Sequence, residues 1–357
     1  MSSDFFPAPF LSNPHLQTIW GRVTRSRQLV PLRREWLETP DGDELVLDHI
    51  DESAVRSRQS AGERNDDALS PSTADRRPPT ADSNLHFVLM HGLEGSSNSV
   101  YMQGVLSVIA REGHSATAMN FRSCARDPQN LDRMLPNRRP RFYHSGETGD
   151  FDFVVRTLAA RHPHRRFLAF GASLGGNVLL KWLGEHTGQT TITAAATLSV
   201  PYDLGAGAAH LETTAPGRFY VARFLQTLRK KATRPDIAEL IDTAPVLRAR
   251  TFKEFDDCAT GPLHGFIDAV DYYTRSSSIH FLDKITTPAL ALNAEDDPFL
   301  PPHVLPRAKA AASPAVDFRT TPTGGHVGFV SGDAPWRPEY WAEGYVVRWL
   351  IAKADAV

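Results

Sequence analysis

A serine between glycines is the residue in this sequence best suited to nucleophilic chemistry. Gly171-Ala-Ser173-Leu-Gly175 follows an apolar run at 166–170 that predicts a strand, and it opens a helical pattern at 173–185. In that context a serine projects from a sharp, strained turn, and the glycines let strand and helix approach closely. The alternative is a glycine-rich turn that binds phosphate at a helix N-terminus. The sequence has neither of the usual phosphate-binding glycine patterns, so we favour Ser173 as a nucleophile.

A serine hydroxyl becomes a good nucleophile only when a base takes its proton. His326 lies in Thr323-Gly-Gly-His-Val-Gly-Phe329, directly after a predicted strand at 316–320, and its glycines permit a loop that swings the imidazole toward the serine. An acid that orients the imidazole is expected after the preceding strand, at 289–292. We favour Asp297 because Pro298 holds it extended, while Asp296 stays open as the alternative.

Acyl chemistry also requires hydrogen-bond donors where the oxyanion develops. We expect the backbone N–H of Leu174, next to the serine, to be one donor. The other is expected to be the backbone N–H of Leu93, in the loop after the predicted strand at 85–90. His91 in that loop is interpreted as a residue that shapes the loop, with a general acid as the alternative.

Strands alternate with helices along most of the chain. Strands are predicted at 85–90, 115–121, 166–170, 192–200, 289–292 and 316–320, with helices at 98–112, 148–161, 173–185, 304–312 and 338–352. A hairpin is predicted at 34–50 around Asp41-Gly42. Such alternation indicates a mostly parallel sheet covered by helices on both faces. Residues 1–357 are therefore expected to form one α/β domain.

Three segments depart from this rhythm. Residues 1–31 carry apolar side chains without a clean period, which we interpret as an arm packed on the body, although its aromatics could line a substrate entrance. Residues 51–84 are rich in Arg, Ser, Asp, Pro and Ala, which predicts a disordered surface insertion. Residues 201–283 are mainly helical, which we interpret as a cap over the ends of the sheet, with a plain structural excursion as the alternative. An apolar wall for substrate is expected there, with helix core as the other reading, from Phe219, Tyr220, Phe224 and Tyr273.

Long strings throughout the chain resemble the AB hydrolase 4 family of YheT-like proteins. They are Asn13-Pro-His-Leu-Gln-Thr18, His91-Gly-Leu-Glu-Gly-Ser-Ser-Asn98, Asn120-Phe-Arg-Ser-Cys124, Tyr143-His-Ser-Gly-Glu-Thr-Gly-Asp150, Gly171 to Trp182, Glu254-Phe-Asp-Asp257, Asn293-Ala-Glu-Asp-Asp-Pro-Phe299 and Gly324-Gly-His-Val-Gly-Phe329. The resemblance implies an α/β-hydrolase fold and a triad of Ser173, Asp297 and His326. It also implies esterase or lipase activity on acyl esters without a metal, and some relatives transfer acyl groups to alcohols.

The sequence therefore predicts a serine-dependent carboxylic ester hydrolase that acts through an acyl-enzyme on a small-molecule or lipid acyl ester. The alternatives are an acyltransferase using an alcohol or lysolipid, and a catalytically silent binding protein on the same fold. A net charge of −2 gives no global attraction to nucleic acid, and two cysteines outside any CxxC pair make a structural zinc site improbable. No cofactor or metal is expected. No signal peptide or run of about 18 apolar residues is present, so we expect a cytoplasmic protein, with peripheral membrane contact as an option.

Overall fold

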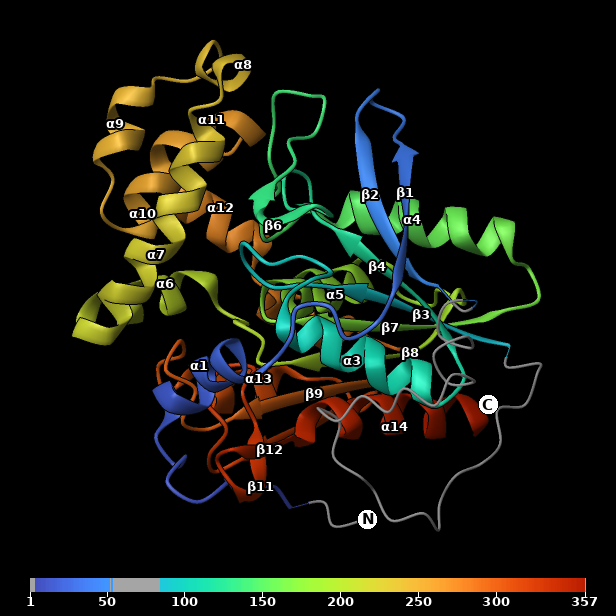
Figure 1. The fold of residues 1–357 in the computed structure, drawn as a ribbon. Helices are drawn as coiled ribbons and strands as arrows, with labels where there is room; N and C mark the ends of the chain where they lie inside the picture. Colours follow the sequence, from blue (N-terminus) through green and yellow to red (C-terminus); the bar gives the residue numbers. More distant parts are fainter. Residues whose placement is uncertain (1–3, 52, 54–83, 357) are drawn as a thin grey trace.

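The computed structural model describes residues 4–51, 53 and 84–356 (Figure 1). An eight-stranded sheet forms its centre, in the spatial order β1-β2-β4-β3-β7-β8-β9-β10. The six strands from β4 to β10 pair in parallel, while β2 is antiparallel to both β1 and β4. The predicted mostly parallel sheet is confirmed. The strands are β1 Leu32–Glu38, β2 Glu44–Ile50, β3 Leu85–Met90, β4 Ser115–Asn120, β7 Arg166–Ala172, β8 Ile192–Leu198, β9 Ala289–Ala294 and β10 Val316–Thr321.

Helices cover both faces of the sheet, as the sequence predicted. One face packs against α3 (Val100–Arg111) and α14 (Trp341–Asp355). The other packs against α4 (Thr148–Arg161), α5 (Leu174–Glu185) and α13 (Val304–Ala311). Every residue of β3, β4 and β9 is buried, because strands between two helical layers have no solvent face.

The segment between β8 and β9 is mainly helical and stands beside the sheet (Figure 1). Its long helix α7 contributes Val221, Leu225 and Leu228 to a hydrophobic cluster separate from the two sheet-face clusters. This helical segment coincides with the predicted cap at 201–283. Its main helices are α6 Leu204–Thr213, α7 Ala215–Ala232, α8 Pro235–Ala238, α9 Thr243–Arg248, α10 Phe252–Phe255, α11 Gly261–His264 and α12 Ala269–Ser276, with a π-helical turn at Asp256–Thr260.

Four smaller features were not predicted. The N-terminal arm contains a helix, α1 (Pro14–Thr24), whose N-cap Asn13 accepts hydrogen bonds from two backbone N–H groups. Two short hairpins form, β5–β6 (Arg126–Asp127, Asn130–Met134) and β11–β12 (Val330–Ala334, Arg337–Tyr340). Because β12 occupies the start of the predicted last helix, α14 begins at Trp341 rather than at 338. The predicted disordered insertion at 51–84 lies almost wholly outside the described residues. Among the described helices, none is long and apolar enough to cross a membrane.

Candidate active site

Ser173 sits at the turn between β7 and α5, the strand–turn–helix position that the sequence predicted. Its backbone has φ 51° and ψ −120°, a conformation that side chains rarely adopt. The flanking glycines are required sterically. A Cβ on Gly171 would lie 2.5 Å from the Gly175 carbonyl oxygen, and one on Gly175 would lie 2.6 Å from that of His91. The turn therefore brings α5 against the end of β3 and exposes the serine at its tip.

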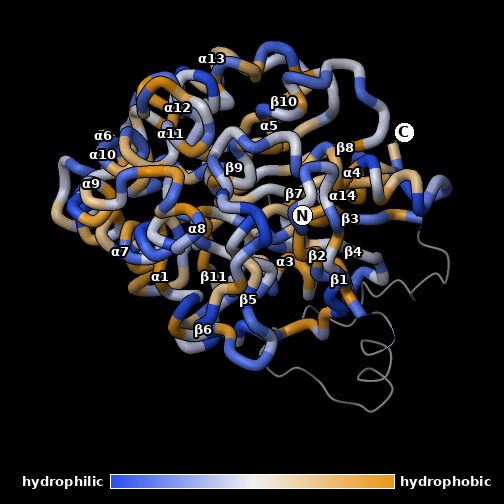
Figure 2. The backbone as a smooth tube through the Cα atoms, turned by 90° about the horizontal axis from the view of Figure 1, so that it is seen from above, coloured by the Kyte–Doolittle hydropathy of each residue, from blue (hydrophilic) through white to orange (hydrophobic). Residues whose placement is uncertain are grey.

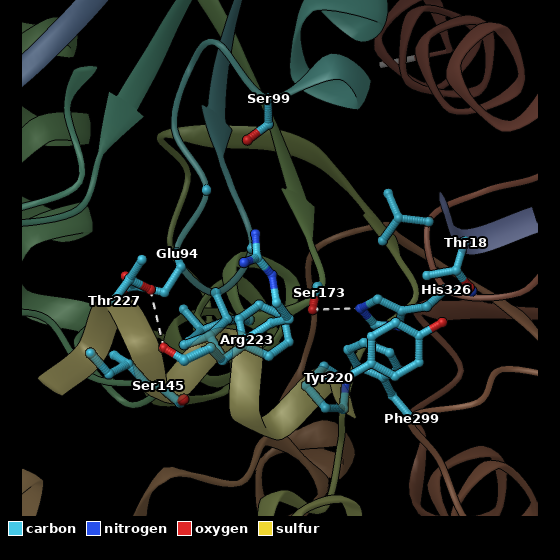
Figure 3. A pocket seen from close by; sticks show the side chains of 18 of the residues that line it. Thr18, Glu94, Ser99, Ser145, Ser173, Tyr220, Arg223, Thr227, Phe299 and His326 are labelled. Atoms are coloured by element: carbon cyan, nitrogen blue, oxygen red, sulfur yellow. Dashed lines mark hydrogen bonds between the residues drawn. The ribbon is translucent and has the colours of Figure 1, made fainter. Parts of the chain in front are cut away.

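The imidazole of His326 lies between Ser173 and Asp297. Its Nε2 is 2.8 Å from Ser173 Oγ (Figure 3). Its Nδ1 is 2.8 Å from Asp297 Oδ2. The ring of Phe299 stacks on the imidazole with centroids 4.1 Å apart and planes 6° from parallel. Three side chains from the ends of β7, β9 and β10 thus meet at one edge of the sheet, in the arrangement of a nucleophile, a base and an orienting acid.

The two neighbouring aspartates make different contacts. Asp297 is buried and reaches the imidazole, while its other oxygen accepts from the backbone N–H of Phe299 at 2.9 Å. Asp296 instead accepts from the backbone N–H of Gly325 at 2.9 Å, and burial raises the pKa of its carboxyl. Asp296 therefore holds the glycine turn before the histidine, and Asp297 is the carboxylate in contact with the His326 imidazole.

The N-terminal helix α1 holds the histidine loop from the other side. The backbone N–H of His326 donates to Thr18 Oγ1 at 3.0 Å, and Gln17 Oε1 accepts from the Val330 N–H at 2.6 Å. Gly325 has φ 61°, and a Cβ there would lie 2.4 Å from the Pro14 carbonyl oxygen. Sequence reasoning missed this role of α1. The available signal was Asn13-Pro14, a capping residue followed by proline at a first helical position.

The two expected oxyanion donors lie in segments that line the cavity around Ser173. Leu174 is the first residue of α5, so its N–H has no intrahelical acceptor. Leu93 lies in the loop after β3, where both neighbouring N–H groups are occupied. That of Gly92 donates to Tyr101 Oη at 2.7 Å, and that of Glu94 donates to Tyr143 Oη at 2.7 Å. Leu93 and Leu174 both line the cavity that contains Ser173.

His91 is buried and fixes the conformation of this loop through its hydrogen bonds. Its Nε2 accepts from the Phe121 N–H at 3.1 Å, so the proton is on Nδ1, which donates to the Gly92 carbonyl at 2.7 Å. Burial lowers the pKa of His91 to about 3, and the ring is therefore neutral. These contacts agree with a loop-shaping residue rather than a general acid.

A buried charged cluster connects the same loop to the helical segment. Glu94 Oε1 accepts from Lys231 Nζ of α7 at 2.5 Å and from the Tyr143 hydroxyl at 2.9 Å. Lys231 also donates to Cys124 Sγ at 3.1 Å and lies over the Tyr143 ring. Burial raises the pKa of the Tyr143 hydroxyl well above its ordinary value, which keeps it protonated and able to donate. Tyr143, for which the sequence offered no definite role, thus supports the Leu93 loop.

A cavity of about 770 Å³ surrounds Ser173 and His326. The helical segment forms one wall, and α1 and the loop after β3 form others. All four predicted wall residues line it, namely Phe219, Tyr220, Phe224 and Tyr273. They differ in their surroundings. Phe219 is mostly exposed, whereas Tyr220 and Phe224 pack against Phe299, and Tyr273 donates to the buried Asp256 carboxylate at 2.7 Å.

Among the described residues, one set of side chains has donors close enough together for a metal ion. The ligand atoms of His144, Glu147 and His264 lie within 4.8 Å of one another. However, Arg141 already pairs with Glu147, and His144 Nδ1 accepts from the Gly146 N–H at 3.2 Å. Since an arginine occupies the carboxylate and one imidazole lone pair is used, this set fits a cation poorly.

Comparison with known proteins places this chain in a family. Residues 86–333 match the family described as the alpha/beta hydrolase fold. The YheT protein of Escherichia coli is 34% identical over 99% of this chain and 95% of that protein. Phospholipase ABHD3 of Mus musculus is 30% identical over 95% of this chain and 76% of its own length. The solved structure of an esterase from Pyrococcus furiosus superposes with a TM-score of 0.50 at 14% identity, covering 90% of this chain and 89% of that chain, which shows the shared fold. The chain therefore belongs to the α/β-hydrolase superfamily and, within it, to the YheT-like branch that its motifs predicted.

Proposed function

We propose that this protein is a serine-dependent carboxylic ester hydrolase that works through an acyl-enzyme. The observation that carries the proposal is the hydrogen-bonded series Ser173, His326 and Asp297 in a cavity large enough for an organic substrate. The names of two relatives, a candidate esterase from Escherichia coli and a phospholipase from Mus musculus, agree with ester hydrolysis.

In the first half-reaction, Ser173 Oγ attacks the acyl carbon while His326 Nε2 accepts the hydroxyl proton. The Asp297 carboxylate holds the His326 Nδ1–H and stabilises the imidazolium that forms. The carbonyl oxygen gains negative charge, which the N–H groups of Leu93 and Leu174 stabilise. Removing one such donor typically costs about 3 kcal/mol of transition-state stabilisation. The imidazolium then protonates the leaving alcohol oxygen as its bond to the acyl carbon breaks.

In the second half-reaction, water attacks the acyl-enzyme. His326 takes a proton from the water as its oxygen bonds to the acyl carbon, and returns it to Ser173 Oγ as the ester to the enzyme breaks. The products are the free carboxylic acid and the regenerated serine. No cofactor or metal enters this scheme.

The substrate is proposed to be a small-molecule or lipid acyl ester, with the acyl chain along the aromatic wall. Phe219, Tyr220, Phe224 and Tyr273 supply that wall, and Phe299 joins them beside His326. The helical segment acts as the cap in this proposal, because it closes one side of the cavity over Ser173. A cytoplasmic location stays a prediction of the sequence.

Fluorophosphonate labelling followed by intact-mass analysis tests the proposal. Wild type is expected to gain one adduct, and Ser173→Ala none. Ser145→Ala is a matched control, because Ser145 lines the same cavity without contacting His326. A panel of p-nitrophenyl esters of increasing chain length then reports the preferred acyl group. If folded Ser173→Ala keeps its esterase activity, this nucleophile is wrong.

Two further measurements separate the alternatives. Product analysis with an added alcohol distinguishes hydrolysis, which yields only free acid, from acyl transfer, which yields a new ester. A folded wild type that stays unlabelled and hydrolyses no ester in the panel would instead support a binding protein on this fold.

A further inference from the structure

Helix α1 presents three of its apolar side chains to solvent. Leu16, Ile19 and Val23 lie three and four residues apart on its outer face, and Val23 is 77% exposed. The inner face combines Trp20, which packs on Ala8, Leu11 and Val330, with a buried polar residue. Gln17 is fully buried, donating to the Leu11 and Val330 carbonyl oxygens. A surface helix ordinarily turns its apolar side chains to the core, and α1 does so only with Trp20, so the three outer residues are not explained by the core of this protein.

Two further exposed aromatics lie beside α1. Phe219 of α7 is 64% exposed, and Trp336, between β11 and β12, is 78% exposed. Hydrogen bonds join α1 to the residues next to these aromatics in the chain, Tyr220 and Pro335. His15 Nδ1 is 3.1 Å from Tyr220 Oη, and Trp20 Nε1 donates to the Pro335 carbonyl at 3.0 Å. Figures 1 and 2 both show α1 between α7 and β11. We call the five exposed apolar residues the mouth surface, namely Leu16, Ile19, Val23, Phe219 and Trp336.

Arginines accompany the mouth surface. Arg22 of α1 and Arg218 and Arg223 of α7 are exposed, and none forms an ion pair within the described part of the chain. Arg218 donates to the Glu212 carbonyl and Arg223 to Gln226 Oε1, so both cations lack a counter-charge. The whole chain has a net charge of −2, so this positive charge is a local property of the surface.

The mouth surface is continuous with the candidate active site. Ile19, Arg22, Phe219 and Arg223 line the same cavity as Ser173. In Figure 3, Arg223 lies beside Ser173, on the side away from His326. Whatever covers this surface therefore faces the cavity entrance.

We propose that the mouth surface docks on a lipid bilayer that contains anionic headgroups. Exposed apolar side chains accompanied by arginines on α1 and α7 match the two layers of such a surface, where the apolar groups enter the acyl region and the arginines meet the headgroups. A second copy of this chain fits less well, because an isologous contact would bring like-charged arginines together. Helix α1 has 11 residues and lies on the bilayer in this arrangement. The inference goes beyond ester hydrolysis, because docking is a property of the surface alone.

Co-sedimentation with vesicles tests the proposal. The full chain carrying Ser173→Ala is used so that lipid is not consumed, with vesicles of phosphatidylcholine alone or mixed with phosphatidylglycerol. Binding is expected to be stronger to the mixed vesicles and to weaken as salt is raised. The variant Val23→Ser/Trp336→Ser, whose residues do not line the cavity, should lower the partition coefficient by about tenfold or more, because two large apolar groups no longer enter the bilayer.

Two controls sharpen this test. Leu247→Ser/Ile267→Ser removes two exposed apolar residues outside the cavity, 59% and 89% exposed, and should bind vesicles as the parent does. Arg218→Gln should weaken binding to the mixed vesicles by about fivefold at low salt, the value of one cation at an anionic surface, and should leave binding to phosphatidylcholine unchanged. Circular dichroism checks that each variant is folded.

Three outcomes would overturn the proposal. The first is no sedimentation of the parent with mixed vesicles, and the second is equal binding by the parent and Val23→Ser/Trp336→Ser. The third is a parent protein that does not bind vesicles but forms a concentration-dependent dimer in light scattering, which Val23→Ser/Trp336→Ser abolishes. A second copy of the chain would then cover the mouth surface. Fluorophosphonate labelling of the wild type is scored separately, so failure of docking and failure of the proposed hydrolysis give different results.

Discussion

Removing the charge of Lys231 should destabilise the protein more than any loss of a surface charge. Lys231 is buried near the C-terminal end of α7, where its ammonium contacts the Glu94 carboxylate, the Cys124 sulfur and the Tyr143 ring. Glu94 Oε2 is also buried and has no hydrogen-bond partner within the described residues. In Lys231→Met the methylene volume is nearly kept, but the Glu94 carboxylate loses its only cationic partner in that cluster.

The size of the loss follows from this burial. Breaking a buried ion pair by removing one partner costs about 3–5 kcal/mol, because an uncompensated charge stays in the interior. The exposed neighbour Lys230 offers a matched control, since removing a surface charge costs about 0–1 kcal/mol. The double variant Glu94→Gln/Lys231→Met should recover much of the stability, because it no longer buries a charge.

Urea unfolding followed by tryptophan fluorescence measures these differences in unfolding free energy. We expect Lys231→Met to fall well below Lys230→Met, with the double variant between Lys231→Met and wild type. Equal midpoints for Lys231→Met and Lys230→Met would refute the reasoning, because the Glu94 carboxylate would then have found water or another partner. If the changes in unfolding free energy for Glu94→Gln alone and Lys231→Met alone add up to that of the double variant, the two side chains are not coupled, which would refute the reasoning.

Three further predictions follow from single contacts. Gly175→Ala places a methyl group 2.6 Å from the His91 carbonyl oxygen, so it should cost about 1–3 kcal/mol in urea unfolding, and a variant as stable as wild type would contradict that fit. Thr18→Val removes the acceptor of the His326 N–H and should lower kcat for a p-nitrophenyl ester about tenfold. Thr18→Ser keeps that acceptor and should have the kcat of wild type. Equal kcat values for Thr18→Val and wild type would show that α1 does not position the base. Burial raises the pKa of Asp256 from an ordinary 3.8 to about 7, so between these pH values the folded protein holds a proton that the unfolded chain has released. The free energy of unfolding therefore falls as the pH rises from 3.8 to about 7. The Tm of wild type should therefore fall relative to Asp256→Asn between those pH values, and parallel curves would disprove the shift.

The order of strands and helices was predictable because each depends on a local pattern. Strands such as β3 and β9 are short apolar runs, and helices such as α4 have apolar residues on one face, so their periods are visible in the sequence. The sharp turn at Ser173 was predictable for the same reason, since its glycines and the flanking strand and helix are adjacent in the chain. Helix α1 was missed because Leu16, Ile19 and Val23 are exposed while Gln17 is buried beside Trp20, so its apolar residues showed no clean helical period.

The partners of Ser173 and the surroundings of the cavity depend on distances that the sequence does not contain. Asp296 and Asp297 differ by one position, and only the fold shows that one meets Gly325 while the other meets His326. Ser173 and His326 are 153 residues apart along the chain, yet their reacting atoms are 2.8 Å apart in space. Local composition therefore determined the elements and the candidate chemistry of this protein. The tertiary structure decided which carboxylate, helix and buried lysine support that chemistry, because those contacts form only when distant segments pack together.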